Sequence, residues 1–358
     1  MATALLNPAP IATAARLTDS HGRVIHDLRV SITDRCNYKC VYCRTGEAES
    51  PANRSSSVRW EVGPQYPELS IDEYLRLIKV FVALGISKVR LTGGEPLLRR
   101  GLLELVQELA RLRTLNGDPL DLALTTNGHL LAQLAAPLKA AGLRRVTVSM
   151  DAVDAPTFER ITRVSGSFEA VLAGIRAARK ANLMPLKINC VLLRGFNDSQ
   201  IEGFAEFARR EGVVVRFIEF MPLEEGRLWT PEIVVPLKEI VTRIGRVLPL
   251  VELAPREASE TARRYTFADG VGEIGIIAPV SQAFCGACSR VRLTSDGKIR
   301  TCLFSQVEHD LYGRLRAGTS DAELASYIAQ TVQGKEERHH IGEPGFLKPS
   351  RSMVHIGG

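Results

Sequence analysis

The sequence predicts an α/β fold: an open, partial barrel of six βα units, followed by a smaller C-terminal domain. From residue 29 to about residue 219, short β-branched runs alternate with longer helical patterns at a spacing of about 30 residues. Repeated βα units of this length give parallel strands joined by right-handed crossovers. Six units are fewer than the eight of a closed barrel, so we expect the barrel to stay open. Beyond Pro222 the alternation ends, which predicts a second unit.

Each expected strand is a short run of β-branched and apolar residues, the composition that strands favour. The six runs cover residues 28–32, 88–92, 122–125, 145–149, 186–191 and 213–219. Helical patterns between them cover residues 71–84, 101–113, 130–141, 168–181 and 200–210. The first helix follows a capping box formed by Ser70 and Glu73, which is typical of a helix start.

The rest of the chain predicts a mixed C-terminal domain. We expect a helix over residues 236–244, antiparallel strands over 265–277 and 291–303, and helices over 306–315 and 321–330. The second strand region would turn at Ser295-Asp296-Gly297, a sequence typical of hairpins. Three regions follow: a disordered tail over 1–22, the barrel over 23–222 and the C-terminal domain over 223–358. Residues 44–69, rich in Ser, Pro, Gly and charge, are expected to form a long loop without an assigned role.

Composition excludes several classes of protein. The chain has 358 residues, 45% hydrophobic and 24% charged, which is ordinary for a globular protein. No apolar run approaches the roughly 20 residues that span a bilayer, and the Ala-rich first 17 residues lack the apolar core of a signal peptide. The net charge of +6 suits an anionic partner. Because there is no RNA-binding aromatic motif or long basic block, we expect a polyphosphate small molecule and no nucleic acid.

Six of the seven cysteines form two groups of three near opposite ends of the chain. The groups are Cys36-x3-Cys40-x2-Cys43 and Cys285-x2-Cys288-x13-Cys302. Three thiols leave a structural zinc site one ligand short, and a disulfide framework favours even counts in short secreted chains. A four-iron cluster held by three thiolates leaves one iron free to bind a small molecule. The triplets therefore predict two open iron–sulfur sites in a reducing compartment, the cytoplasm.

Other motif residues follow the expected strands, and parallel sheets place their chemistry at the carboxyl ends of strands. The first triplet follows the first strand, Gly93-Gly94-Glu95-Pro96 the second and Thr126-Asn127-Gly128 the third. Ser149-Met150-Asp151 ends the fourth strand, and Glu219-Phe220-Met221-Pro222 ends the sixth. Each motif alone is also a common turn sequence. Together they predict one functional rim.

The first cysteine loop, with Tyr42 as its aromatic residue, resembles that of the radical S-adenosylmethionine superfamily, and Gly93–Pro96 resembles its glycine-rich turn. The resemblance implies a partial (βα)6 TIM-like barrel of the radical SAM type, with a smaller C-terminal domain that carries a second iron–sulfur cluster. It implies that Cys36, Cys40 and Cys43 hold the [4Fe-4S] cluster that splits S-adenosylmethionine into a 5′-deoxyadenosyl radical. The implied contacts of that cosubstrate are Tyr42, Gly94, Ser149 and Met221.

The second triplet narrows the resemblance. The stretch Phe284-Cys285-Gly286-Ala287-Cys288-Ser289-Arg290-Val291-Arg292, completed by Cys302, resembles the GTP 3′,8-cyclase family of molybdenum cofactor biosynthesis. The stretches at 28–34, 89–96 and 125–128 and the terminal Gly-Gly do so too, so the resemblance covers residues 28–358 except the 44–69 insertion. It implies that Cys285, Cys288 and Cys302 hold a second [4Fe-4S] cluster, whose open iron meets the guanine base of GTP.

The same resemblance implies how GTP is held and changed. The implied nucleotide contacts are Arg29, Arg90, Thr125, Lys187, Arg290 and Arg292. Arg forks suit a triphosphate, and Arg290 and Arg292 alternate along one strand, so both should face the same side. Catalytic roles are implied for Arg290, Arg292, Gly357 and Gly358, with the glycine tail entering the active site. The adenosyl radical would take hydrogen from C3′ of GTP, and C3′ would bond to C8, giving (8S)-3′,8-cyclo-7,8-dihydroguanosine 5′-triphosphate.

The expected partners are GTP, an external reductant and a downstream cyclic pyranopterin synthase, without a membrane; a homodimer is left open. Two alternatives also stay open: a two-cluster radical enzyme that acts on a peptide, and an iron–sulfur electron-transfer protein. The Arg290 and Arg292 pair argues against the first, and the three-ligand count argues against the second. Elsewhere we expect Cys190 in the core, His339 and His340 in solvent, and no catalytic role for Asp151.

Overall fold

The computed structural model of the chain describes residues 16–43, 67–224, 226 and 228–357. Most of the expected tail, most of the insertion at 44–69 and the terminal Gly358 lie outside the described residues. The tail expected over residues 1–22 is wrong for its last seven residues, 16–22, because they pack on the barrel. Leu17 is buried, and its N–H donates a hydrogen bond to the carbonyl of Leu84 (3.0 Å).

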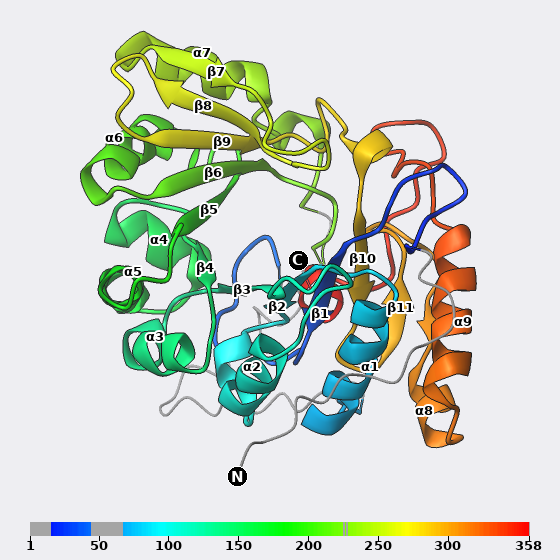
Figure 1. Cartoon of the computed structure of the whole chain (residues 1–358). Helices are drawn as coiled ribbons and strands as arrows, with labels where there is room; N and C mark the ends of the chain where they lie inside the picture. Colours follow the sequence, from blue (N-terminus) through cyan, green and yellow to red (C-terminus); the bar gives the residue numbers. More distant parts are fainter. Residues whose placement is uncertain (1–15, 44–66, 225, 227, 358) are drawn as a thin grey trace, which may run out of the picture.

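The six expected barrel strands form a curved parallel sheet (Figure 1). They are β1 (Asp27–Ser31), β2 (Lys88–Thr92), β3 (Asp121–Thr126), β4 (Arg145–Ser149), β5 (Lys187–Leu192) and β6 (Val214–Glu219). Each begins and ends within one residue of its predicted range, and successive strands pair in parallel. In β5 and β6, fully buried residues alternate with partly exposed ones. The sequence therefore predicted both the class of the barrel and its strand order.

The strands after Pro222 extend this same sheet instead of forming a sheet of their own. They are β7 (Leu250–Leu253), β8 (Arg263–Phe267), β9 (Glu273–Ile277), β10 (Arg290–Leu293), β11 (Lys298–Arg300) and β12 (His309–Asp310). β9 pairs in parallel with β6 at one edge, and β10 pairs in parallel with β1 at the other. The resulting sheet has twelve strands in the order β12-β11-β10-β1-β2-β3-β4-β5-β6-β9-β8-β7. The C-terminal residues that carry the second cysteine triplet are therefore joined directly to the first strand of the barrel.

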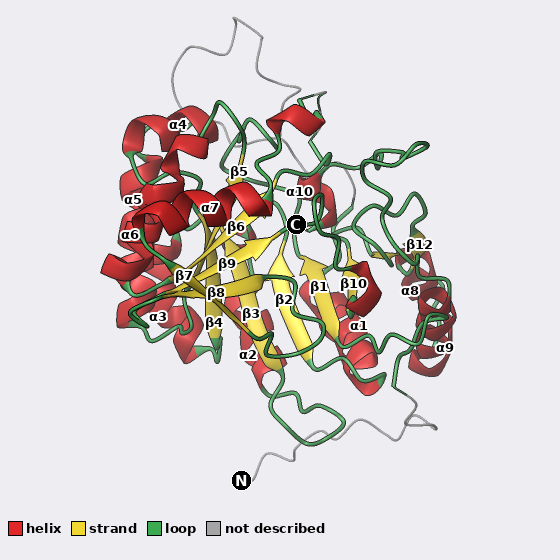
Figure 2. Ribbon diagram, turned by 90° about the horizontal axis from the view of Figure 1, so that it is seen from above, coloured by secondary structure: helices red, strands yellow, loops and turns green. Residues whose placement is uncertain are grey.

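The helices of the barrel cover the outer face of the sheet (Figures 1 and 2). The expected helices are α1 (Ile71–Ala83), α2 (Leu102–Ala110), α3 (Leu131–Ala140), α5 (Ser167–Lys180) and α6 (Ile201–Glu211). The Ser70–Glu73 capping box is present. A short helix, α4 (Ala155–Thr162), was not predicted; it begins at Asp154, whose side chain accepts a hydrogen bond from the Thr157 N–H (2.8 Å).

The C-terminal region adds four helices: α7 (Leu237–Val247), α8 (Tyr312–Arg316), α9 (Asp321–Gln333) and α10 (Met353–Ile356). The first three lie in the predicted regions, whereas the last is a short turn of helix near the C-terminus that the sequence pattern did not indicate. Within the described ranges, none of the helices has the length and apolar character needed to cross a membrane. The last described residues of the chain, up to Gly357, lie inside the barrel (Figure 1).

Candidate active site

One cavity in the barrel collects nearly all of the expected site residues. Both cysteine triplets line it, together with the expected contacts of S-adenosylmethionine and most of those of GTP. The expected residues on its wall are Arg29, Cys36, Cys40, Tyr42, Cys43, Arg90, Gly94, Thr125, Ser149, Met221, Cys285, Cys288, Arg290, Arg292 and Cys302. Lys187 and Gly357 are described but do not belong to that wall. Two motifs almost 250 residues apart in the sequence thus face the same space.

The first cysteine triplet lies in the loop after β1, and α4 holds this loop in place. The backbone N–H groups of Lys39 and Val41 donate to the carbonyls of Thr162 (3.1 Å) and Ile161 (3.0 Å). The Tyr38 N–H donates a hydrogen bond to Sγ of Cys36 (3.4 Å). The unpredicted helix α4 is therefore the support of the first cysteine loop.

The glycine turn after β2 packs directly against the same loop. The N–H of Gly94 donates to the carbonyl of Thr33 (2.7 Å), and a Cβ at Gly94 would overlap the carbonyl of Arg35. Only glycine allows this approach. The neighbouring Glu95 is fully buried and accepts hydrogen bonds from the Thr126 hydroxyl (2.7 Å) and the Asn127 N–H (2.7 Å). Burial raises the pKa of Glu95 to about 7, and the carboxyl group ties the second rim turn to the third.

Asp151 has a positioning contact that the sequence did not indicate. It is buried on the cavity wall and accepts hydrogen bonds from the Tyr42 hydroxyl (2.7 Å) and the Val191 N–H (2.8 Å). Burial raises its pKa to about 6. Tyr42, the aromatic residue of the cysteine loop, is therefore fixed to the end of the fourth strand.

The second cysteine triplet lies beside positive charge. Burial opposes ionisation of Cys288, but the positive charges of Arg290 and Lys335 outweigh it and lower the pKa of this thiol to about 7. Burial raises the pKa of Cys302, and Lys335 acts against that rise. The Arg23 guanidinium donates to the Cys285 carbonyl (2.9 Å), so the start of the chain supports this triplet.

The two triplets fit iron–sulfur clusters as ligand sets. None of the six cysteines forms a disulfide, and all six are partly exposed. In the described part of the chain, no three His, Cys, Asp or Glu side chains converge on a single metal ion. Three thiolates in each triplet suit a cluster, in which each thiolate binds a different iron, better than a structural zinc site, which takes four ligands.

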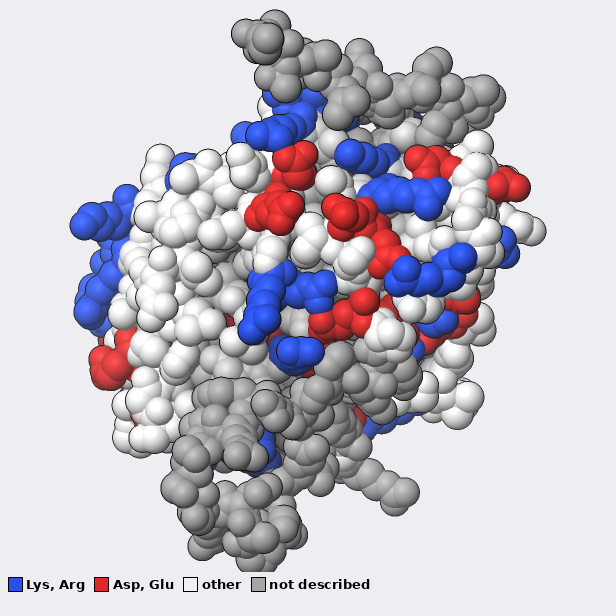
Figure 3. Space-filling view, turned by 90° about the horizontal axis from the view of Figure 1, so that it is seen from below, with Lys and Arg blue, Asp and Glu red and all other residues white. Residues whose placement is uncertain are grey.

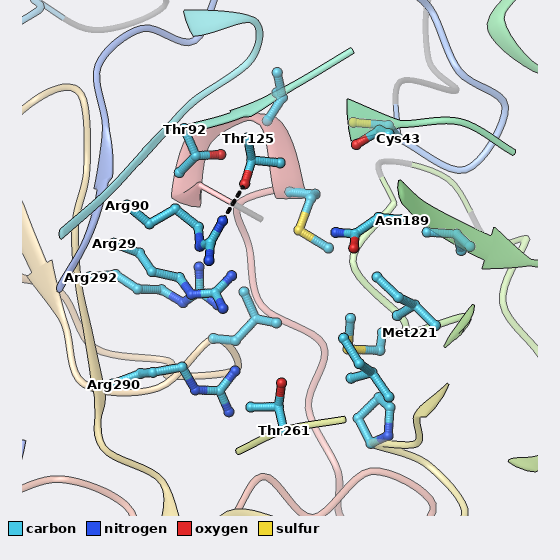
Figure 4. A pocket seen from close by; sticks show the side chains of 18 of the residues that line it. Arg29, Cys43, Arg90, Thr92, Thr125, Asn189, Met221, Thr261, Arg290 and Arg292 are labelled. Carbon is cyan, nitrogen blue, oxygen red and sulfur yellow. Dashed lines mark hydrogen bonds between the residues drawn. The ribbon is translucent and has the colours of Figure 1, made fainter. Parts of the chain in front are cut away.

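Three arginines lie side by side at one level of the sheet, a set that we name the arginine row. Arg292 of β10 is opposite Arg29 of β1, and Arg29 is opposite Arg90 of β2. Figure 4 shows them projecting from one wall, with Arg290 next to them and Met221 on the opposite wall. Like charges placed opposite one another on neighbouring strands destabilise a sheet. An anion bound among these arginines would therefore relieve their repulsion.

Burial of the arginine side chains makes a neutralising anion still more favourable. Nε of Arg29 and Nε of Arg90 are buried without a hydrogen-bond partner among the described residues. Burial together with the nearby Arg29 and Arg216 lowers the pKa of Arg90 to about 9. The hydroxyl of Thr125 accepts a hydrogen bond from Arg90 (3.3 Å), a neutral contact that does not offset the charge.

Arg216 is a further inward-facing cation that the sequence analysis did not select. It lies on β6, lines the cavity and donates to Oδ1 of Asn189 on β5 (2.9 Å). Burial and the nearby Arg29 lower its pKa to about 9. A signal was available, because a charged residue within the apolar strand 213–219 is unusual.

Lys187 lies at the start of β5, away from the cavity wall. Its pKa is lowered to about 8 by burial and then by the neighbouring Arg216 and Arg145. Its expected nucleotide contact therefore stays a prediction. The strand places its side chain on the same barrel face as Asn189, two residues along.

The C-terminal tail enters the barrel up to the last described residue. Gly357 is buried, has a φ of 69°, and accepts a hydrogen bond at its carbonyl from Arg292. A Cβ at Gly357 would lie 2.8 Å from Cγ2 of Thr92. Gly358 lies outside the described residues, so its expected role is not tested.

Two minor expectations have different outcomes. Cys190 is buried in the core, as predicted. The expectation that His339 is solvated is wrong: it is partly buried, lines the cavity, and its ring lies 5.3 Å from that of Phe304. Its neighbour His340 is exposed and pairs with Glu343 (2.8 Å). The polar sequence around His339 does not indicate that its side chain points inward. That orientation depends on the fold of the C-terminal segment.

The outer surface shows no comparable concentration of one charge in the view of Figure 3. Basic and acidic side chains lie side by side toward the centre and right of that view, and a broad area left of centre carries neither. The like charges that do gather are inside the barrel, on the cavity wall. This distribution suits a small anionic ligand in the cavity.

Comparisons with known proteins agree with this geometry. Residues 30–208 match the model of the radical SAM superfamily, and residues 213–341 match that of Molybdenum Cofactor Synthesis C. A protein of Xanthomonas axonopodis pv. citri named GTP 3′,8-cyclase is 44% identical over 348 residues, which cover 96% of this chain and 99% of that protein. A protein of the same name from Moorella thermoacetica is 41% identical over 342 residues, with 96% and 100% coverage.

Among solved structures, Streptococcus suis SuiB bound to S-adenosylmethionine superposes with a TM-score of 0.55 at 13% identity, covering 88% of this chain and 69% of that one. At this identity the likeness concerns the fold alone, and it confirms the predicted radical SAM type of barrel. The two family models and the relatives at more than 40% identity decide the family. The chain belongs to the GTP 3′,8-cyclase family of the radical SAM superfamily.

Proposed function

We propose that this protein is the radical S-adenosylmethionine enzyme that converts GTP to (8S)-3′,8-cyclo-7,8-dihydroguanosine 5′-triphosphate, the first step of molybdenum cofactor biosynthesis. One observation carries the proposal: a single cavity joins two cysteine triplets, each one ligand short, to the arginine row, in which Nε of Arg29 and Nε of Arg90 are buried without a hydrogen-bond partner among the described residues. An electron-transfer protein has no use for such cations, and a peptide has no matching polyanion. The family relationship favours the same reading over both alternatives.

The first half of the cavity suits S-adenosylmethionine. Cys36, Cys40 and Cys43 would hold a [4Fe-4S] cluster, which when bound supplies the electron that splits the cosubstrate into methionine and a 5′-deoxyadenosyl radical. Gly94 presents its backbone at the rim without a side chain in the way. Tyr42, held by Asp151, and Ser149 and Met221 on the cavity wall would fix the adenosyl group.

The other half suits GTP. Cys285, Cys288 and Cys302 would hold a second cluster next to the base. The arginine row, with Arg290, would bind the triphosphate by charge-assisted hydrogen bonds and so neutralise the repulsion among its own members. Thr125, which already accepts a hydrogen bond from Arg90, would contact the nucleotide too, with Lys187 nearby. The ribose would then face the half of the cavity lined by Cys36, Cys40 and Cys43.

The protein also has to exclude water from this reaction. Met353 and Val354, just before the terminal glycines, line the cavity as apolar side chains. Gly357 is held against Arg292 inside the barrel, and Gly358 follows it in the sequence. Exclusion of solvent protects a radical and strengthens every charge interaction in the site. We assign these four positions to closure of the cavity and to alignment of the arginine row.

The setting of the reaction follows from the same chemistry. Cysteines that hold open clusters must stay reduced. We therefore expect a reducing compartment, which we take to be the cytoplasm. The enzyme would need an external reductant, and its product would pass to a cyclic pyranopterin synthase. A homodimer is compatible with this proposal but not required by it.

The direct test is anaerobic turnover. The reconstituted protein is incubated with GTP, S-adenosylmethionine and a reductant, and 5′-deoxyadenosine and the cyclised nucleotide are measured. We expect about eight irons per chain and 5′-deoxyadenosine formation that depends on GTP. ATP in place of GTP is the matched control. Formation of 5′-deoxyadenosine that is the same with ATP, or no cyclised product with GTP, would contradict the assignment.

A further inference from the structure

Lys335 is a buried ammonium group in an unusual position. Only 3% of its surface is exposed, yet it lines the cavity. It follows α9 directly, after Gly334, and its side chain turns inward to the carbonyl of Thr301, which accepts its hydrogen bond. Thr301 precedes Cys302, so the lysine reaches the second cysteine triplet through the neighbouring residue.

Among the described residues, no carboxylate forms an ion pair with Lys335, and the Thr301 carbonyl is its one hydrogen-bond acceptor. The adjacent Glu336 is engaged elsewhere, because one of its oxygens accepts a hydrogen bond from the Thr301 hydroxyl (2.7 Å). A buried charge without a partner is strongly unfavourable. A negatively charged group next to Lys335 would therefore stabilise the folded protein.

The nearest source of negative charge is the second triplet. Lys335 lines the same cavity as Cys285, Cys288 and Cys302, and the carbonyl that it holds belongs to the residue just before Cys302. Three thiolates carry more negative charge than an oxidised cluster core carries positive charge, so an open cluster has a net negative charge to be balanced.

We propose that Lys335 is the counter-charge of the second iron–sulfur cluster: its ammonium group balances the thiolates of Cys285, Cys288 and Cys302 and raises the reduction potential of the cluster. The proposal rests on the second cluster of the proposed function. Lys335 is a positioning and charge-balancing residue here, and it need not touch GTP. The competing explanation is structural, with the lysine acting only as a tether for the Thr301 carbonyl.

Three variants of the full chain separate charge from tethering. Lys335→Met removes the charge and the hydrogen bond, Lys335→Gln keeps an N–H donor without the charge, and Lys335→Arg keeps the charge. Each is made in a parent chain in which Cys36, Cys40 and Cys43 are changed to Ser, so that only the second cluster can form. Lys298→Met is the matched control, because Lys298 pairs with Asp310 outside the cavity (2.7 Å).

The readouts are iron content and a redox titration followed by electron paramagnetic resonance. We expect Lys335→Met and Lys335→Gln to shift the midpoint potential to more negative values, while Lys335→Arg and Lys298→Met leave it near that of the parent. Loss of iron in the Met and Gln variants, with retention in the Arg variant, would support the proposal as well. An unchanged potential in the Met variant, a Gln variant that matches the parent, or loss of iron in all three would overturn it. A parent chain that binds no iron would instead overturn the second cluster itself.

Discussion

The guanidinium of Arg292 donates a hydrogen bond to the carbonyl of Gly357, a residue 65 positions later in the chain. This contact joins the arginine row to the C-terminal tail inside the barrel. Gly357 lies in the left-handed region of backbone conformation, with a φ of 69°, and Thr92 and Ser31 leave no room for a side chain. The tail is therefore part of the cavity, and its last described residue is fitted to glycine.

Gly357→Val should expel the tail. A β-branched residue is strained at this φ, and its Cβ would lie 2.8 Å from Thr92. We expect formation of the cyclised product to fall by at least about tenfold, because loss of one aligning contact costs on the order of 1.4 kcal/mol in the transition state. Iron content should be unchanged. Gly318→Val, at a similar φ of 75° with open space around it, is the control for backbone strain. Equal activity of Gly357→Val and the wild type would contradict the role of the tail.

Arg292→Ala should weaken GTP binding and leave the clusters in place. Loss of a charge-assisted hydrogen bond costs about 1.5–3 kcal/mol, which is a rise in Kd of roughly tenfold to a hundredfold. Isothermal titration calorimetry with GTP under anaerobic conditions measures this change. Arg209→Ala is the control, because Arg209 pairs with Asp269 on the outer surface (2.6 Å).

Arg290→Ala should behave in the same way as Arg292→Ala, since both line the cavity. Arg292→Lys should recover part of the affinity, because it restores the charge without the fork of donors. Loss of iron in either alanine variant would mean that the arginine is structural, and its assignment to the nucleotide would be wrong.

Glu219 is a buried joint between the barrel and the C-terminal region. Its carboxylate accepts hydrogen bonds from the N–H groups of Leu237 (3.0 Å), Val280 (2.9 Å) and Ser281 (2.8 Å), and from the Ser281 hydroxyl. It lies at the end of β6, two residues before Met221. One side chain thus sets the start of α7 and the segment that leads to Cys285.

Glu219→Ala should lower the free energy of unfolding by on the order of 3 kcal/mol, because one buried donor and three partly buried donors lose their acceptor. It should also reduce iron content to about half, through the second triplet, with the first triplet still loaded. Anaerobic urea denaturation and iron analysis check both effects. Glu202→Ala, which removes a partly exposed partner of Arg243, should cost less than about 1 kcal/mol. If the two variants are equally stable, Glu219 does not stabilise the connection between the barrel and the C-terminal region.

Lys187 should make GTP binding pH-dependent. In the free protein, burial and the neighbouring Arg216 and Arg145 hold its pKa at about 8, below the ordinary value for lysine. A triphosphate favours the protonated form, so binding takes up a proton above this pKa. Affinity is therefore highest below about pH 8 and falls as the pH rises, by roughly tenfold at one unit above the pKa.

Calorimetric titrations of the wild type, Lys187→Met and Lys187→Arg at about pH 7 and about pH 9 test this expectation. The Met variant should bind more weakly at the lower pH and show a smaller change between the two. The Arg variant should keep its affinity at the higher pH, because its side chain stays charged. A Met variant with the pH dependence of the wild type would remove Lys187 from the nucleotide site.

Local sequence patterns were sufficient to predict much of the barrel. The six barrel strands were predictable because each is a short β-branched run bounded by turn residues, and parallel strands bring their following loops to one edge. The same rule predicted that Gly94, Ser149 and Met221 lie near the first cysteine loop, and all three line the cavity with it. Helix α4 was not predicted, because its eight residues are too few for a clear helical period and one of them is Pro156.

The buried polar residues around the site were harder to predict. Glu95 and Asp151 are common turn residues in sequence, and only their partners, Thr126 and Tyr42, reveal their function as supports. Lys335 and His339 lie in a polar stretch that is typical of solvent-exposed chain. Their inward orientation depends on contacts with residues more than thirty positions earlier, such as Thr301 and Phe304.

The sequence by itself determined the chemistry: two cysteine triplets, a glycine turn and a set of arginines, all of which depend on residue type and close spacing. Only the tertiary structure decided that the two triplets share one cavity, because this follows from the pairing of β10 with β1. That pairing also creates the arginine row, since it sets Arg292 opposite Arg29 in the same register. Strand pairing between distant segments depends on the packing of the whole sheet, which no local pattern in the chain encodes.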